Sequence, residues 1–509
     1  MQTVKPIETD VVELSVSAWF YRNRTIAGFD NPARSLYVSI RELVENSLDA
    51  SEDAGYLPEV KVTLSRISER SDLGDLFSAG PEEFKLRVED NGGGIPRSKV
   101  PKLIGKMLTG TKFMLRQNRG TFGLGGSLAL LYGQVTTQKP IKICTAIPGE
   151  NLRHELIMRL DIEQNTPKII RENSIRKDPD DHGTIVEFAL QGDWIRSKTR
   201  IADYFTQTSI IVPYASIIFS NPDGETLTYK RLIETLPRRP KDMKPHPEGI
   251  DVEMLKQMIR KTKKNTLSKF FMKAFQRVGT TTAQAFLDYA ELDPDIPPKT
   301  LKREELVALM NAMASYDKFL PPSPKSLSPA GEAVLEAGLK RLEPEFVAVS
   351  TRSPSVYEGH PFIIETAVAY GGGLQPGINL LRFANRIPLL YDERSDVSSR
   401  VIRDLRLKNY ELKQEDPLVF LTHICSTKVP YKTVGKEFIG DVDAVRREVD
   451  LGFKECLRRV SEGVRKKNRA KRKARRENKL QTYYEFLTDT LSAATGRQIS
   501  SSILFGDER

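Results

Sequence analysis

The sequence predicts a multidomain chain of mixed α/β (α+β) class. A length of 509 residues suggests about three domains at roughly 150 residues each. Hydrophobic residues make up 39% and charged residues 28% of the chain, which is typical of ordinary globular cores. Segments with a helical period and segments with strand-like alternation are mixed without a strict strand–helix order. No apolar run approaches the roughly 18 residues that a membrane helix needs, so we expect no membrane association.

The region up to about residue 240 opens with a predicted helix in NPARSLYVSIRELVENSLDASEDAG. Pro32 is placed where helices often begin, and Leu36, Ile40, Val44 and Leu48 recur every four residues as one apolar stripe. Strands are expected in VKVTLSRI, FKLRVED, IKICTAI, TIVEFAL and SIIFSNPDGETLTY. This mixture predicts an α/β sandwich.

Two proline-rich segments divide the rest of the chain. Residues 236–248 are polar and rich in proline and predict a linker, and residues 249–317 are almost entirely helical in pattern. After LPPSPKSLSPAGE, strand and helix patterns return in FVAVSTRS, FIIETAVAYGG, NLLRFANRIPLLYD and LVFLTHICSTKVPY. A long helix is expected from about Gly440 into the C-terminal tail.

The charge of the chain favours a polyanionic partner. The net charge is +11, and residues 465–479 hold ten basic residues against one acid, Glu477. This run is either a solvated like-charge tail or a contact to nucleic-acid phosphates. The N-terminus has no apolar signal-peptide core, and three scattered cysteines fit no zinc spacing and suggest a reducing compartment. We therefore expect a cytoplasmic protein.

Three glycine-bearing segments follow the opening helix. In VEDNGGGIP, Asp90 ends a strand and could accept a hydrogen bond from an exocyclic amine, while Gly92 and Gly94 permit a close ligand approach; a plain surface turn is the alternative. In TGTKFMLRQNRGTFGLGGSLALLYG, glycines precede an apolar helical run, which suits phosphates, and Lys112 and Arg119 add positive charge. In DHGTIVEF, the Thr184 hydroxyl could bond an adenine or a water molecule.

The order and spacing of these segments resemble the Bergerat ATPase superfamily, which includes gyrase, a heat-shock chaperone, histidine kinases and MutL. The resemblance implies ATP and Mg²⁺ as ligands. Glu42 and Asn46 are four residues apart and share one helix face; the resemblance implies that Glu42 deprotonates the attacking water and that Asn46 holds Mg²⁺. Glu45 and Asp49 are expected on a solvated or paired flank, with Arg41 placed to pair with Glu45.

Segments outside the ATP motifs are similar to one branch, the B subunits of the archaeal type IIB DNA topoisomerase VI family. They are SAWFYRNRTIAGFDNPARSLYVSIRELVENSLDA, RQNRGTFGLGG, KPHPEGID, FQRVGTTTA, GHPFIIETAVAYGG, RFANRIPLLYDE and CSTKVPYKTVGKE. The resemblance implies an N-terminal strap (1–20), a Bergerat-fold ATPase domain (21–240), a helix-two-turns-helix domain (241–315), a transducer domain (316–465) and a basic C-terminal helix or tail (466–509).

The resemblance also implies the site residues. Glu42 and Lys436 are the expected catalytic residues, Lys436 being a transducer lysine at the γ-phosphate; Lys428 and Lys432 are weaker alternatives for that role. Asn46 is the expected metal ligand. The expected nucleotide contacts are Asn46, Asp90, Gly92, Gly94, Thr111, Lys112, Gly120, Thr121, Phe122, Gly123, Leu124, Gly125, Gly126, Ser127, Thr184 and Lys436.

The family resemblance implies the ATP-hydrolysing part of an isomerase. ATP-driven dimerisation would gate the passage of double-stranded DNA through a break made by the topoisomerase VI A subunit, in an A2B2 heterotetramer at the nucleoid, relaxing supercoils and decatenating DNA. Two positions depart from the family pattern: Ser127 stands where some relatives have lysine, and Leu407 stands where a Trp-Lys-x-Tyr motif has tryptophan. The competing interpretations are a mismatch-repair or chaperone-like ATPase, and a non-catalytic scaffold that binds DNA and its partner with a degenerate ATP site.

Overall fold

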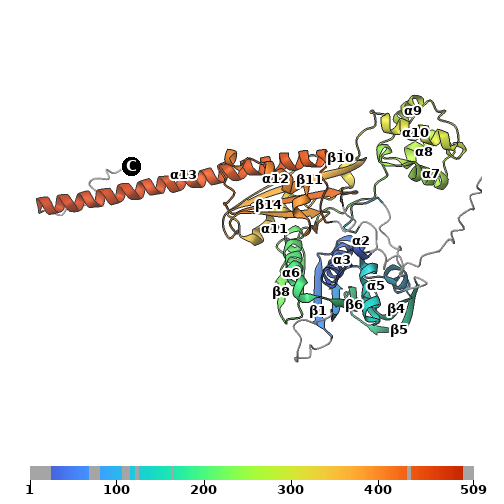
Figure 1. The fold of residues 1–509 in the computed structure, drawn as a ribbon, viewed down its shortest axis with the longest axis horizontal. Helices are drawn as coiled ribbons and strands as arrows, with labels where there is room; N and C mark the ends of the chain where they lie inside the picture. Colours follow the sequence, from blue (N-terminus) through green and yellow to red (C-terminus); the bar gives the residue numbers. More distant parts are fainter. Residues whose placement is uncertain are drawn as a thin grey trace, which may run out of the picture.

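The computed structural model describes residues 24–67, 81–105, 115–120, 125–161, 166–432 and 437–496. Two β-sheets with their helices, a separate group of helices and one long terminal helix make up this part of the chain (Figure 1). The predicted mixed α/β class is confirmed. Within these residues, no helix is long and apolar enough to cross a membrane.

Helix α3 (Pro32–Ala54) is the central helix of the first layer. Asn31 caps its start, because its side-chain oxygen accepts a hydrogen bond from the Arg34 amide at 2.8 Å, and Pro32 occupies the first turn. Gly55 ends the helix in the left-handed conformation at φ 86°. The predicted apolar stripe is confirmed, since all four of its members are buried: Leu36, Ile40, Val44 and Leu48.

The first sheet has its described strands in the order β5-β4-β3-β6-β2-β1-β7-β8. Neighbours in this order are antiparallel except β1 and β7, which run parallel. The strands are β1 (Glu59–Arg66), β2 (Glu82–Asp90), β3 (Ile141–Ala146), β4 (Leu152–Asp161), β5 (Thr166–Arg176), β6 (Gly183–Gly192), β7 (Ser216–Ser220) and β8 (Thr226–Tyr229).

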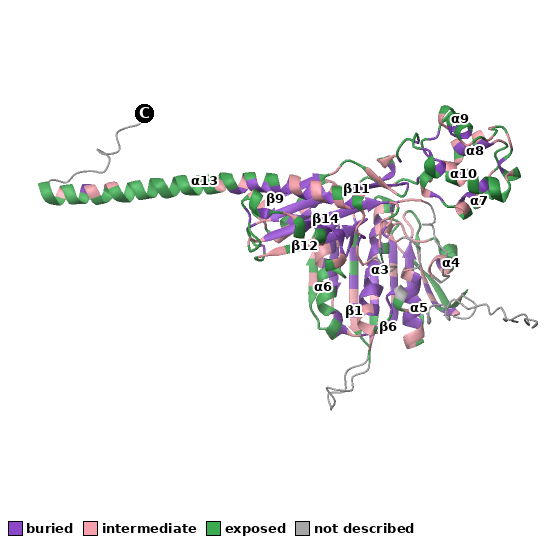
Figure 2. Ribbon diagram, turned by 45° about the horizontal axis from the view of Figure 1, so that its top comes forward, coloured by how far each residue is buried: buried purple, intermediate pink, exposed green. Residues whose placement is uncertain are grey.

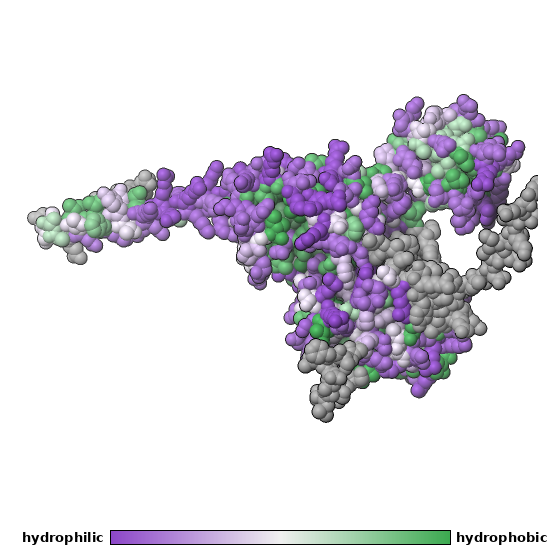
Figure 3. Space-filling view, in the orientation of Figure 1, coloured by the Kyte–Doolittle hydropathy of each residue, from purple (hydrophilic) through white to green (hydrophobic). Residues whose placement is uncertain are grey.

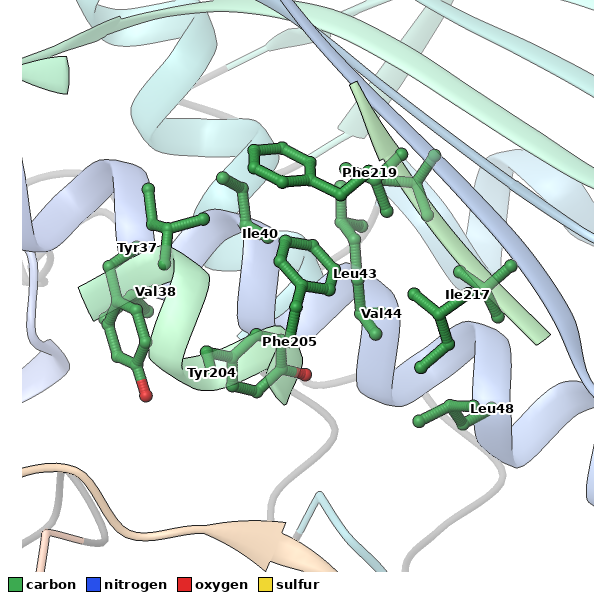
Figure 4. Packing of buried hydrophobic residues seen from close by; sticks show 14 of the residues in the cluster. Tyr37, Val38, Ile40, Leu43, Val44, Leu48, Tyr204, Phe205, Ile217 and Phe219 are labelled. Atoms are coloured by element: carbon green, nitrogen blue, oxygen red, sulfur yellow. The ribbon is translucent and has the colours of Figure 1, made fainter. Parts of the chain in front are cut away.

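Helices α3, α5 (Gly125–Thr137) and α6 (Trp194–Ile211) cover this sheet, while α4 (Val100–Gly105) and the short α2 (Arg24–Ala27) lie nearby. Burial alternates along the central strands, so one side of the sheet faces the helices (Figure 2). The core joins side chains of α3, α6 and β7, including Phe205 stacked on Phe219 with ring centroids 4.5 Å apart (Figure 4). The result is the predicted α/β sandwich.

Several elements of this layer were not predicted from the sequence patterns: β4, β5, α6 and the short helices α2 and α4. Most residues of β5 are exposed, and its sequence does not alternate between apolar and polar residues. It lies at the edge of the described sheet, where β4 supplies its hydrogen bonds. Tertiary pairing with β4, rather than local pattern, holds it as a strand.

The second body is a group of helices that stands apart from the sheets in Figure 1. It consists of α7 (Val252–Lys261), α8 (Leu267–Ala274), α9 (Thr280–Tyr289) and α10 (Arg303–Ser315), in agreement with the helical pattern expected there. A phenylalanine-rich cluster fills its centre, with Phe270, Phe271 and Phe286 each at most 2% exposed. This core is separate from those of the two sheets.

The second sheet follows the order β10-β11-β14-β12-β13, with β9 also paired to β11. Among its described strands, only β12 and β14 run parallel. Helix α11 (Glu332–Leu339) joins this sheet to α6: a Cβ atom at Gly338 would lie 1.8 Å from the Ile210 carbonyl oxygen, so the two backbones touch. The other elements are β9 (Phe346–Thr351), β10 (Ser355–Tyr357), β11 (His360–Tyr370), β12 (Ile378–Ala384), β13 (Ile387–Pro388), α12 (Val397–Asp404) and β14 (Leu418–Ser426).

Helix α13 (Asp443–Thr495) is a single 53-residue helix that covers the second sheet and then leaves it. Its buried residues run from Val445 to Val464 at helical spacing, and in the described helix beyond that point only Thr488 is buried. Figure 2 shows the outer part of the helix as exposed. In Figure 3 this part is first hydrophilic, where the basic run lies, and then apolar towards its tip.

Candidate active site

Glu42 and Asn46 lie on the face of α3 that meets the start of α5. A Cβ atom at Gly125 would lie 1.6 Å from Oε2 of Glu42, and one at Gly126 would lie 2.8 Å from Nδ2 of Asn46. Both separations are shorter than any real contact, so glycine is needed at both positions for these side chains to stay where they are. The two predicted residues of α3 thus meet two predicted residues of the glycine-rich segment.

Asp90, at the end of β2, is held by three hydrogen-bond donors. Its Oδ1 accepts from the Gly92 amide at 2.9 Å and the Thr184 amide at 3.2 Å, and its Oδ2 accepts from the Ser47 hydroxyl at 3.0 Å. Burial raises the pKa of Asp90 to about 6, although these donors act in the opposite direction. Since Ser47 follows Asn46, the Asp90 carboxylate lies beside the same stretch of α3 as Glu42 and Asn46.

The backbone around Asp90 forms a narrow cradle in which side chains have no room. Gly94 has φ 69°, and a Cβ there would lie 2.1 Å from the Ala146 carbonyl oxygen. Gly183 has φ 127°, and a Cβ atom there would lie 1.9 Å from the Asp90 carbonyl oxygen. Such close approach is not required by a plain surface turn. These glycines therefore let the segment pack closely against the backbone at the end of β3, and the approach of a ligand there stays a prediction.

The remaining predicted contacts are only partly described. Ser127 is buried in the first turn of α5, and nothing lies within 4 Å of the position that a Cβ atom would take on Gly120. Seven predicted residues lie outside the described part of the chain, as does the N-terminal strap (1–20): Thr111, Lys112, Thr121, Phe122, Gly123, Leu124 and Lys436.

The expectation that Arg119 adds charge for phosphates is wrong. Its guanidinium is 4% exposed and forms ion pairs with Asp49 and Glu52 of α3, each at 2.6 Å. Glu52 also pairs with Arg386 of the second sheet at 2.8 Å. Arg119 therefore fastens its own segment to α3, while Glu52 also joins α3 to the turn that carries Arg386. The expectation for Asp49 as a paired residue is confirmed.

The described residues that flank the predicted transducer lysine in the sequence, Tyr431 and Glu437, both lie near α3. Glu437 forms an ion pair with Arg34 of α3. On the other side, burial raises the pKa of the Tyr431 phenol, and the nearby carboxylates of Glu45 and Glu42 raise it further while Arg41 opposes them. Lys428, by contrast, pairs with Glu358 at 2.9 Å with both side chains about half exposed.

The residues at the junction of α3 and α5 fit a nucleotide bound with a divalent cation. Within the described residues, no three His, Cys, Asp or Glu side chains gather as metal ligands. Asn46 offers one side-chain oxygen, which fits Mg²⁺ in nucleotide sites, because most of its ligands there are phosphates and waters. The amide groups at the start of α5 and the cradle at Asp90 suit phosphates and a base amine, respectively.

Two contacts in the site have no signal in the sequence patterns. Ser47 positions Asp90 across 43 residues of sequence, and Arg41 donates from Nη2 to Oε1 of Glu42 at 2.7 Å. Arg41 also lies 3.6 Å from Glu45, so that predicted ion pair is confirmed, while Glu45 itself is buried rather than solvated. Only the three-dimensional placement reveals that the shorter contact of Arg41 is to Glu42.

Comparison with known proteins gives the family. Residues 31–191 match the family model described as histidine kinase-, DNA gyrase B-, and HSP90-like ATPase, and residues 322–476 match that of the topoisomerase VI B subunit transducer. The B subunit of type 2 DNA topoisomerase 6 from Metallosphaera sedula is 42% identical, covering 94% of this chain and 88% of that protein. The corresponding protein from Saccharolobus solfataricus is 40% identical, covering 90% and 86%.

A solved structure, the B-subunit of DNA gyrase from Myxococcus xanthus, aligns with a TM-score of 0.44 and 8% identity over 87% of this chain and 95% of that one. The matched families favour the topoisomerase resemblance over a mismatch-repair or chaperone-like ATPase. The resemblance drawn from the sequence is therefore confirmed. The chain belongs to the family of type 2 DNA topoisomerase 6 B subunits, with a gyrase B-like ATPase region in its N-terminal half.

Proposed function

We propose that this chain binds and hydrolyses ATP with Mg²⁺ at the junction of α3 and α5, and that this reaction drives a type IIB topoisomerase. The observation that carries the proposal is the contact of Glu42 and Asn46 with Gly125 and Gly126. It brings a carboxylate and a side-chain amide group to the start of a helix, where backbone N–H groups favour phosphate oxygens.

Each residue has a distinct role in this proposal. Glu42 accepts a proton from the water that attacks the terminal phosphate, a contribution worth roughly 10²–10⁴-fold in rate. Asn46 gives one oxygen to Mg²⁺, which when bound would neutralise phosphate charge. The Asp90 carboxylate accepts from the amine of the base, with Thr184 and the glycine cradle beside it. Lys436, ten residues beyond β14 in the sequence, contacts the γ-phosphate in this proposal.

The reaction has a mechanical output in this proposal. Two copies dimerise through their ATPase regions with the strap (1–20) reaching the partner copy, and so close around a DNA duplex. The A subunit of the enzyme makes the break through which the duplex passes, and α13 binds it in an A2B2 heterotetramer that acts in the cytoplasm at the nucleoid. The domain divisions remain proposals: 21–240, 241–315, 316–465 and 466–509. Helix α13 runs without interruption through the boundary between residues 465 and 466.

The experiment that tests the proposal measures ATP turnover and relaxation of supercoiled DNA by the full chain assembled with the A subunit. Glu42→Ala should lower the ATPase rate by about 100-fold or more while nucleotide still binds, because the carboxylate acts on water rather than on the nucleotide. ATP hydrolysis at a nearly normal rate would contradict the assignment of Glu42. Lack of ATPase activity in the wild-type assembly with DNA present would favour the scaffold interpretation.

The lysine assignment has a matched control. Lys436→Ala should reduce turnover more than nucleotide binding, because a contact to the γ-phosphate distinguishes ATP from ADP. Lys428→Ala, which removes an exposed pair with Glu358, should leave both unchanged. If Lys428→Ala instead gives the larger loss of turnover, Lys436 is not the γ-phosphate lysine.

A further inference from the structure

Arg41 is a buried arginine whose charge has no assigned role in the reaction. It is 8% exposed and is surrounded by acidic and aromatic groups. Its Nη2 donates to Oε1 of Glu42 at 2.7 Å, its Nε lies 3.6 Å from Oε1 of Glu45, and its guanidinium carbon lies 5.8 Å from the centre of the Tyr37 ring. Burial disfavours its charge, but Glu42 and Glu45 outweigh burial and raise the pKa of Arg41 above its ordinary value.

The contact between Arg41 and Glu42 does not follow from helix geometry. Side chains of adjacent helical residues point in directions about 100° apart and do not face each other, whereas residues four apart do. Tyr37 and Glu45 are each four residues from Arg41, and they hold the arginine stem on its own face of α3. The guanidinium then reaches sideways to the Glu42 carboxylate, so residues other than Glu42 contribute to its position.

We propose that Arg41 is the positioning residue for the Glu42 carboxylate, fixing one of its oxygens so that the other is presented to the reacting water. The proposal rests on the proposed function, in which Glu42 is the base. Arg41 contacts Oε1, while the start of α5 crowds Oε2, which would lie 1.6 Å from a Cβ atom on Gly125. Arg41 thus binds Oε1, and Oε2 lies against the start of α5, the segment that suits phosphates.

Residues of the second sheet pack on the same cluster. Tyr391 lies against Tyr37 with ring centroids 5.7 Å apart at an interplanar angle of 65°. Tyr431 lies near enough to Glu45, Arg41 and Glu42 for their charges to act on its phenol. The alignment of Arg41 therefore depends on how the segments that follow β13 and β14 are seated on α3.

The test uses Arg41→Gln and Arg41→Lys in the full chain assembled with the A subunit, measuring kcat, KM for ATP, and binding of a non-hydrolysable ATP analogue. Arg41→Gln should lower kcat by roughly 10- to 100-fold, because a misplacement of about 1 Å can cost 10²-fold, with KM and analogue binding changed less than about threefold. Arg41→Lys should recover part of kcat, because an ammonium group still pairs with one oxygen but lacks the rigid fork. Arg66→Gln, far along β1, is the control and should change none of the three.

Removal of Arg41 leaves the buried Glu45 without this cation, so Arg41→Gln/Glu45→Gln provides a charge-balanced variant with the same expected loss of kcat. In a Glu42→Gln background, Arg41→Gln should cause no further loss, because both changes act through one carboxylate. A further loss in that background, or equal losses in kcat and analogue binding, would overturn the positioning role. If Glu42→Gln itself retains normal turnover, the proposed function fails; if Glu42→Gln is inactive but Arg41→Gln is normal, only the positioning role of Arg41 fails.

Discussion

Gly125→Ala offers a direct test of the contact between the glycine-rich segment and the proposed base. The added Cβ would lie 1.6 Å from Oε2, 2.2 Å from Cδ and 2.8 Å from Cγ of Glu42. Ordinary contact begins near 3.4 Å, so the carboxylate must retreat by about 2 Å. These atoms belong to the far end of a flexible side chain, so this side chain rather than the backbone will move. The displacement breaks the 2.7 Å hydrogen bond to Arg41.

The magnitude follows from this displacement. A reacting group misplaced by about 1 Å can cost 10²-fold, and complete loss of a general base costs roughly 10²–10⁴-fold. We therefore expect kcat to fall by about 100-fold or more, equivalent to about 2.7 kcal/mol in activation free energy. Gly125 lies in the first turn of α5, so alanine is compatible with a helical backbone there and gains up to about 1 kcal/mol. Loss of the buried hydrogen bond between Arg41 and Glu42 acts against this gain, so the net change in the free energy of unfolding should stay within about 2 kcal/mol.

The assay is ATP turnover by the assembled enzyme beside thermal unfolding of the variant chain. Gly279→Ala is the matched control, because nothing lies within 4 Å of the position that its Cβ would take and it belongs to the separate helical group. A normal kcat in Gly125→Ala would refute the reasoning. So would a loss that comes with an equal loss of thermal stability, because it would reflect misfolding rather than a displaced carboxylate.

Three further predictions concern other parts of the molecule. The folded-state pKa of Asp90 is raised from 3.8 to about 6, so the stabilising contribution of its protonated form is present below pH 3.8 and is lost as the pH rises through about 6. Asp90→Asn should therefore raise the melting temperature more at about pH 8 than at about pH 5. Equal shifts at the two pH values would contradict this prediction. Leu48→Ala removes a side chain that is 1% exposed, and chemical denaturation should show a loss of about 2–5 kcal/mol in the free energy of unfolding. Replacing three basic residues within 465–479 by glutamine should reduce the slope of log affinity against log salt for duplex DNA by up to about 2.7, at roughly 0.9 per phosphate contact; an unchanged slope would identify this run as a solvated tail.

Local patterns predicted the elements whose burial is periodic. The stripe from Leu36 to Leu48 and the proline at position 32 were enough to predict α3, because a helix with one buried face repeats its apolar residues at that spacing. Strand β5 was not predicted, because an exposed edge strand lacks the alternation of apolar and polar residues that marks a half-buried strand. Its assignment depends on pairing with β4, the preceding strand, and the residue pattern within β5 does not indicate that pairing.

Some residues of the candidate site could likewise be predicted from local sequence patterns, and others could not. Glu42 and Asn46 could be placed on one face of a helix from their spacing, and the glycine segments indicated where a ligand could approach. The role of Arg119 could not be predicted, because its partner Asp49 is 70 residues away in the sequence. Long-range ion pairs of this kind depend on the final packing of several elements, and a basic residue beside a glycine loop suggests phosphate binding whether or not such a pair exists.

The length of α13 has a mechanical consequence. At about 1.5 Å per residue, the stretch beyond Val464 projects roughly 45 Å from the second sheet. If the helix moves rigidly with the sheet, a rotation of the sheet by about 10° would move the end of α13 at Thr495 by roughly 8 Å. Mutual repulsion along the ten basic residues of 465–479 opposes bending of this stretch at low salt. A small rearrangement beside the nucleotide would thereby be magnified into a displacement comparable to half the width of a DNA duplex.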